Sequence, residues 1–182
     1  MDNIIYELKK ITEDAQKTFG YLNTEQINWK PSAESWSVGQ CFEHLIKSNA
    51  ELFPALDKIG SGTWKNSFYQ NYSPLTSFWG NLLVKSLQKD TRKFKTPSVK
   101  IVPPSDVSRD IVERFAENQA EVIAKIKAAE KADLQKTVIT SPFAKFMTYR
   151  LADGYRIIVE HERRHFRQAE RVLQAEGFPN QI

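Results

Sequence analysis

EHERRHF, residues 160–166, lies within the last apolar-periodic segment of the chain, which runs from about Thr148 to Glu176. Apolar residues recur in this segment every three or four positions, which is the period of an amphipathic helix. These positions are Leu151, Tyr155, Ile158, Ala169, Val172 and Leu173. Gly177 and Pro179 follow, and both residue types favour the end of a helix. The sequence therefore predicts a long helix around this stretch.

Three earlier segments have the same period and predict three more helices. They run from about Ile4 to Leu22, from Ser37 to Gly60, and from about Ser105 to Ala129. No convincing run of alternating apolar and polar residues predicts a strand. At 182 residues and 41% hydrophobic content, the chain can form one domain with a substantial core. The sequence thus predicts an all-α fold, a four-helix bundle made by a single domain over residues 1–182.

The start of the second helix is well specified. Ser37 is a typical N-cap, and Gln40 three positions later completes a capping box. Trp36, directly before the cap, is expected to pack against Cys41. His44 therefore lies in the first part of this helix.

The connection between the second and third helices, residues 61–104, is long and rich in aromatic residues. Its aromatic residues include Trp64, Phe68, Tyr69, Tyr72, Phe78 and Trp79. A short helix is predicted from about Thr76 to Lys89. Such a connection can form a lid or a pocket wall, or its aromatic side chains can simply anchor a loop to the core. A second irregular connection is predicted from Ala132 to Lys145.

Composition limits the class of partner and the compartment. The net charge of +4 is spread along the helices, and the stretch Lys85–Lys100 is too short a basic cluster to predict a nucleic-acid partner. The single Cys41 cannot form an internal disulfide, and no apolar run is long enough to span a membrane. The first ten residues lack the apolar core of a signal peptide. We therefore expect a cytoplasmic protein that binds neither nucleic acid nor membranes.

The chain has three histidines, His44, His161 and His165. His161 and His165 are four residues apart on a predicted helix, so both imidazoles project from one face and can share a metal ion. If the helix that carries His44 packs beside them, three neutral nitrogens converge and leave one coordination position open, as in catalytic metal sites. Each histidine could instead be a hydrogen-bonded core residue, and Cys41 could close the site as a fourth ligand.

Two more residues of the last helix are candidates for a catalytic role. Glu162 falls near the centre of the apolar stripe, where a charge is unexpected, so it is a candidate general base or a group that orients a ligand. It could equally form a buried ion pair with an arginine of another helix. Gln168, one turn after His165, could hydrogen-bond a metal-bound ligand or be a packing amide.

Residues 161–165 also match H-E-x-x-H, the motif in which zinc proteases use two histidines as ligands and the glutamate as general base. The third histidine expected six residues after the second is Arg171 here. Only seventeen residues follow His165, and most continue the same helix. A zinc protease is therefore the weaker alternative.

The runs Asn28–Pro31 and Trp36–Gln40, with His44, His161, His165 and Gln168, resemble the DinB/YfiT-like superfamily of metalloproteins. The resemblance spans nearly the whole chain. It implies a four-helix bundle in which His44, His161 and His165 bind a divalent ion, usually zinc or nickel.

The resemblance also suggests a function. Characterised relatives include S-transferases that use the low-molecular-weight thiols bacillithiol, mycothiol or glutathione, and a mycothiol-dependent isomerase of maleylpyruvate. We therefore expect a metal-dependent S-transferase or hydrolase that acts on a small-molecule substrate. The alternative is a non-catalytic, stress-related metal-binding module, which could be a homodimer held by exposed apolar helix faces.

Overall fold

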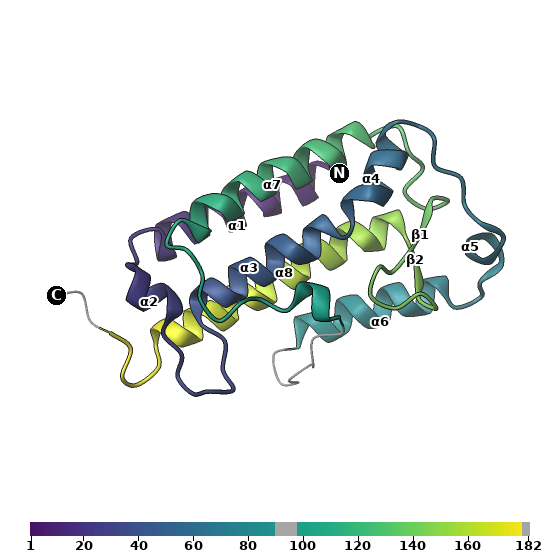
Figure 1. The fold of residues 1–182 in the computed structure, drawn as a ribbon. Helices are drawn as coiled ribbons and strands as arrows, with labels where there is room; N and C mark the ends of the chain where they lie inside the picture. Colours follow the sequence, from purple (N-terminus) through teal and green to yellow (C-terminus); the bar gives the residue numbers. More distant parts are fainter. Residues whose placement is uncertain (90–97, 180–182) are drawn as a thin grey trace.

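The computed structural model describes residues 1–89 and 98–179 and is built mainly from helices (Figure 1). The four long helices are α1 (Asp2–Phe19), α3 (Val38–Ala50), α7 (Ile111–Ala128) and α8 (Leu151–Leu173). Shorter helices are α2 (Thr24–Asn28), α4 (Phe53–Gly60), α5 (Phe68–Tyr72), α6 (Thr76–Gln88) and the 3-10 turn η1 (Val99–Ile101). Two short strands, β1 (Val138–Thr140) and β2 (Thr148–Arg150), form a hairpin.

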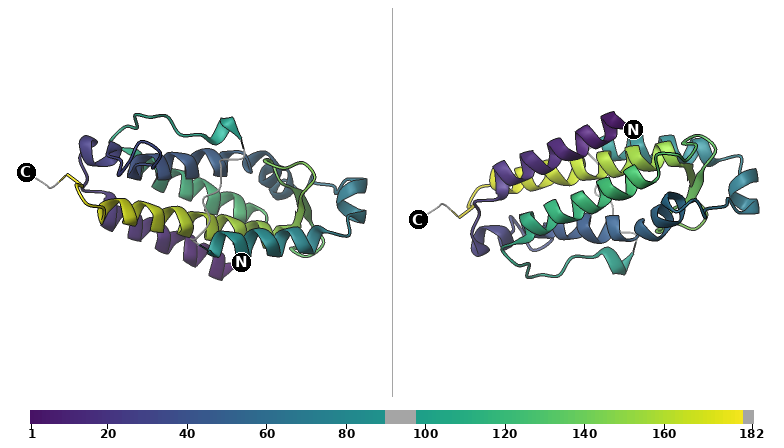
Figure 2. Two further views of the ribbon diagram at one scale, coloured as in Figure 1. Left: turned by 90° about the horizontal axis from the view of Figure 1, so that it is seen from below. Right: turned by 90° about the horizontal axis from the view of Figure 1, so that it is seen from above.

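The four long helices pack as a bundle, which confirms the predicted all-α fold. Helix α3 contacts both α7 and α8, and α1 contacts the same two helices. Apolar faces of all four helices meet in one core, where Phe42 of α3 lies with its ring 5.2 Å from that of Phe19 and 5.0 Å from that of Phe115. Figure 2 shows the four helices running side by side along the length of the molecule.

The second helix begins where the capping box predicts. The Ser37 side chain accepts a hydrogen bond from the backbone of Gln40 at 3.1 Å, and the Gln40 side chain accepts one from the backbone of Ser37 at 3.2 Å. The prediction of one continuous helix to Gly60 was wrong, because α3 ends at Ala50 and α4 starts at Phe53. Pro54 lies in the first turn of α4, where its missing N–H costs nothing, but it could not lie within a continuous helix.

The aromatic-rich connection contains α6, which lies against the side of the four-helix bundle. Helix α6 matches the predicted Thr76–Lys89 helix to within one residue, and it packs on α8 and β2. The close approach of α6 to α8 depends on Gly80, where a Cβ would lie 2.6 Å from a carboxylate oxygen of Asp153. Residues 90–97, which carry part of the predicted basic stretch, lie outside the described residues.

The segment before α8 contains strands that the sequence did not reveal. Thr148 pairs with Thr140, and Val138 with Arg150, so α8 starts at Leu151 rather than at Thr148. Strands of three residues are too short to show an alternating pattern. The third helix was also predicted too long at its start. It begins at Ile111 rather than at Ser105.

None of the described helices is long and apolar enough to cross a membrane.

Candidate metal centre

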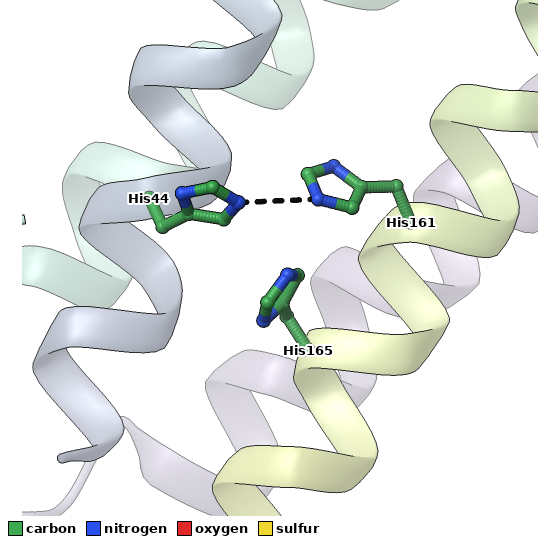
Figure 3. Close-up of side chains that lie close together, drawn as sticks. All are labelled: His44, His161 and His165. Atoms are coloured by element: carbon green, nitrogen blue, oxygen red, sulfur yellow. Dashed lines mark hydrogen bonds between the residues drawn. The ribbon is translucent and has the colours of Figure 1, made fainter. Parts of the chain in front are cut away.

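The three histidines of the chain lie together between α3 and α8, as the sequence predicts (Figure 3). Nε2 of His44 is 3.2 Å from Nε2 of His161. The His165 ring lies beside both, with ring centroids 4.7 Å from each of the other two. Figure 3 shows one His165 nitrogen turned toward the gap between the other two rings. One nitrogen from each ring can be chosen so that all three lie within 4.8 Å of one another.

The His44 ring is held in a defined orientation by a backbone carbonyl. Its Nδ1 is 2.8 Å from the carbonyl oxygen of Ile101 in η1. Because a carbonyl can only accept, Nδ1 must carry the proton, and Nε2 then presents a lone pair to the other histidines. A metal-binding histidine usually has its second nitrogen fixed by such a contact.

Burial keeps the three imidazoles neutral. It lowers the pKa of His161 to about 3, with smaller contributions from the charges of His44 and Arg164. Burial is also the main cause that lowers the pKa of His44 and of His165. The neutral imidazole is the form that binds metal ions, so the cluster is in its ligand form at neutral pH.

The donor set fits a divalent transition-metal ion. Two nitrogens that each lie about 2.0–2.1 Å from a tetrahedral zinc ion are roughly 3.3–3.4 Å apart, close to the observed separation of the His44 and His161 nitrogens. Imidazole nitrogens suit zinc and nickel, whereas calcium and magnesium prefer oxygen ligands. Cys41 is buried and does not belong to the group of side chains that converge here.

Trp36 is a residue of the site that sequence analysis assigned to packing against Cys41. Its ring stacks on His165 at a centroid distance of 5.6 Å and an interplanar angle of 21°, and it lies 4.9 Å from the ring of His44. It therefore fixes the orientation of two of the three imidazoles. Its position directly before the N-cap, two turns ahead of His44, is the signal that could have pointed to this contact.

Glu162 lies in the bundle core and is fully buried. Its carboxyl group accepts hydrogen bonds from Asn49 of α3 at 3.1 Å and from Gln119 of α7 at 2.8 Å. Burial raises the pKa of Glu162 to about 8, although the two amide donors oppose this shift. The sequence allowed an ion pair between Glu162 and an arginine as one possibility. In the structure, two neutral amides donate to the carboxyl group. These contacts favour a structural role, and the general-base role remains a prediction.

Gln168 and Arg164 lie on the same helix as the histidine pair. Gln168 lies one turn after His165, and its side chain partly offsets the effect of burial on the pKa of His165. Arg164 donates to the carbonyl oxygens of Ser86 and Lys89 near the end of α6, at 3.3 and 2.9 Å. Arg164 therefore ties the helix of the histidine pair to the end of α6, and the role of Gln168 at a bound ligand stays a prediction.

Comparison with known protein families gives a match that covers most of the chain. The sequence model of the DinB superfamily matches residues 7–169, which include all three histidines. No curated protein and no solved structure matches the chain.

Proposed function

Because the chain belongs to the DinB superfamily, we propose that it is a metalloenzyme in which His44, His161 and His165 bind one zinc or nickel ion. We propose that its substrate is a small molecule and that its reaction is the transfer of a low-molecular-weight thiol or a hydrolysis.

The convergence of the three histidines is the observation that supports this proposal. His44 and His161 are 117 positions apart in the sequence, yet their nitrogens are 3.2 Å apart. Three neutral imidazoles would fill three of the four positions that zinc prefers and would leave one for an exogenous ligand. Without a cation, His44 and His161 can share one hydrogen bond between their Nε2 atoms, whereas a bound cation would use a nitrogen of all three imidazoles.

An ion in this site would lower the pKa of a coordinated thiol or water, so that a nucleophile is present at neutral pH. The protein contributes the orientation of its ligands. The Ile101 carbonyl holds the proton of His44 on Nδ1, and the Trp36 ring stacks on His165.

The position of Glu162 favours thiol transfer over peptide hydrolysis. In an H-E-x-x-H protease the glutamate takes a proton from the attacking water. Here the carboxyl group of Glu162 is bound by Asn49 and Gln119 in the core. Thiol transfer does not need this base, because the metal ion itself promotes loss of the thiol proton.

An activity assay tests the proposed function. The metal-loaded protein is incubated with bacillithiol, mycothiol or glutathione and an electrophile, and consumption of the thiol is followed. We expect turnover with one of the thiols and a loss of at least about 100-fold in His44→Ala, since the metal ion would hold the thiol as its nucleophilic thiolate. Lys47→Ala, one turn further along α3, is the matched control and should retain activity.

The outcomes separate the proposals. Metal binding without consumption of any of these thiols would contradict thiol transfer and leave hydrolysis or the alternative, a non-catalytic metal-binding module. Undiminished activity in a correctly folded His44→Ala variant would contradict the proposed site.

A further inference from the structure

The segment that forms α5 and most of α6 carries no charged residue. Residues 66–84 read NSFYQNYSPLTSFWGNLLV, whereas 26% of the whole chain is charged. A solvated helical surface normally carries charged side chains on its outer face. The absence of charge over nineteen residues therefore needs a physical reason.

This segment also carries most of the exposed apolar side chains among the described residues. We call seven of them the α5–α6 patch: Phe68, Tyr69, Tyr72, Leu75, Phe78, Leu82 and Phe146. Phe68 is 80% exposed and Tyr72 is 71% exposed. Figures 1 and 2 show α5 at one end of the molecule and α6 along its edge, with α8 on the inner side of α6.

Contacts along the patch connect its members. The rings of Phe68 and Tyr72 lie 4.7 Å apart, and the Tyr69 hydroxyl donates to the carbonyl oxygen of Phe146 at 2.8 Å. The ring of Trp79 lies between Phe146 and Phe78, at 5.6 and 5.1 Å. Leu75, Phe78 and Leu82 are spaced by three and four residues, so they share one face of α6. Tyr69, Phe146 and Phe78 are thus connected through Trp79, and the Phe68–Tyr72 pair lies on the same short helix as Tyr69.

The area of the patch is that of a protein interface. With about 150–250 Å² for a large side chain, the exposed fractions amount to roughly 800 Å². The largest apolar patch on a monomer is typically about 300–600 Å². A stable dimer buries about 800 Å² on each partner. The summed exposure of these seven residues is thus of the size that one side of a dimer interface buries.

We infer that the α5–α6 patch binds the same patch of a second copy of this chain in a two-fold symmetric homodimer. In such an interface each surface meets itself, so any charge near the axis would face a like charge. The uncharged segment 66–84 avoids this repulsion. Residues 66–84 themselves offer no basic group to an anionic membrane and no charge pattern to select a different protein, and the nearest lysines, Lys65, Lys85 and Lys145, lie at the border of the patch.

Sedimentation analysis between about 1 and 100 μM tests this inference. We expect a species of twice the 21.0 kDa chain mass. The double variant Phe78→Glu/Leu82→Glu removes two anchors and places four carboxylates in the interface, so the dimer dissociation constant should rise at least about 100-fold. The double variant Tyr6→Glu/Tyr21→Glu is the matched control. It changes two exposed aromatic residues outside the patch and should leave the dimer intact.

Three results would overturn the inference. They are a wild-type monomer at every concentration, a dimer that persists in the folded Phe78→Glu/Leu82→Glu variant, and a dimer that is lost in the control. Circular dichroism establishes that each variant is folded, and Phe78→Ser/Leu82→Ser replaces the first variant if it is not. The metal content of the monomeric variant should be unchanged, so the inference can fail without affecting the proposed metal site.

Discussion

His161 has its Nε2 only 3.2 Å from that of His44, so these two nitrogens must share a proton or a cation. Burial lowers the pKa of all three histidines, which disfavours added protons and leaves lone pairs available. At the scale of single residues, the site is therefore a set of neutral donors kept neutral by the surrounding core.

Glu162 gives a pH-dependent prediction at this scale. Between pH 4.5 and 8 the folded protein holds a proton on Glu162 that the unfolded chain has lost, so this group makes the wild type less stable as the pH rises. Glu162→Gln cannot titrate. We therefore expect its free energy of unfolding, relative to wild type, to increase by up to about 1.4 kcal/mol per pH unit from pH 5 to 8.

Urea unfolding of both proteins at pH 5, 6, 7 and 8 measures this difference. A chelator is present throughout, so that metal binding does not contribute. A difference between variant and wild type that stays constant with pH would show that Glu162 is not linked to a proton in the folded state.

The sequence predicted that the three histidines lie together, but it did not predict which residues of other helices surround the site. The number of histidines and the four-residue spacing of His161 and His165 can be read directly from the sequence. The contacts of Glu162 with Asn49 and Gln119, and of Trp36 with His165, join residues from different helices, and no local pattern encodes them.

At the scale of elements, the capping box determines where α3 starts and so where His44 lies. The Ser37 side chain satisfies a backbone N–H that the helix leaves without a partner, and Gln40 also donates to the carbonyl of Pro104 at 3.0 Å. We expect Ser37→Ala to lower the free energy of unfolding by about 1 kcal/mol.

Ser32→Ala is the control for this prediction. Ser32 lies in the exposed segment before α3, and its hydroxyl group forms a hydrogen bond with the hydroxyl group of Ser35. Removing the Ser32 hydroxyl should therefore change the free energy of unfolding by less than about 0.5 kcal/mol. The two variants are compared by urea unfolding. Equal stability of both variants would mean that the cap contributes nothing to α3.

Helix periodicity predicted the elements better than their ends. The apolar stripe continues in register past the break between α3 and α4, so only Pro54 could have indicated the interruption. The sequence predicted helix for the residues before α7 because Val107 continues the apolar period of Ile111 and Phe115. Val107 instead lies in a loop, where its N–H donates to Asn28 at 2.8 Å.

At the scale of the whole molecule, packing of α3 on α8 makes the site. The sequence predicted this bundle because four amphipathic segments can bury their apolar faces only against one another. It did not predict α6 beside α8 as a fifth packed helix, or the hairpin that precedes α8. These elements depend on close approaches such as that of Gly80 to Asp153, which a sequence pattern does not show.

X-ray absorption spectroscopy of the zinc-loaded protein tests the central claim most directly. We expect three imidazole nitrogens at about 2.0–2.1 Å and no sulfur ligand, with two imidazoles remaining in His44→Ala. Failure of the protein to retain zinc, a sulfur ligand at about 2.3 Å, or an unchanged spectrum in His44→Ala would contradict a metal site shared by α3 and α8.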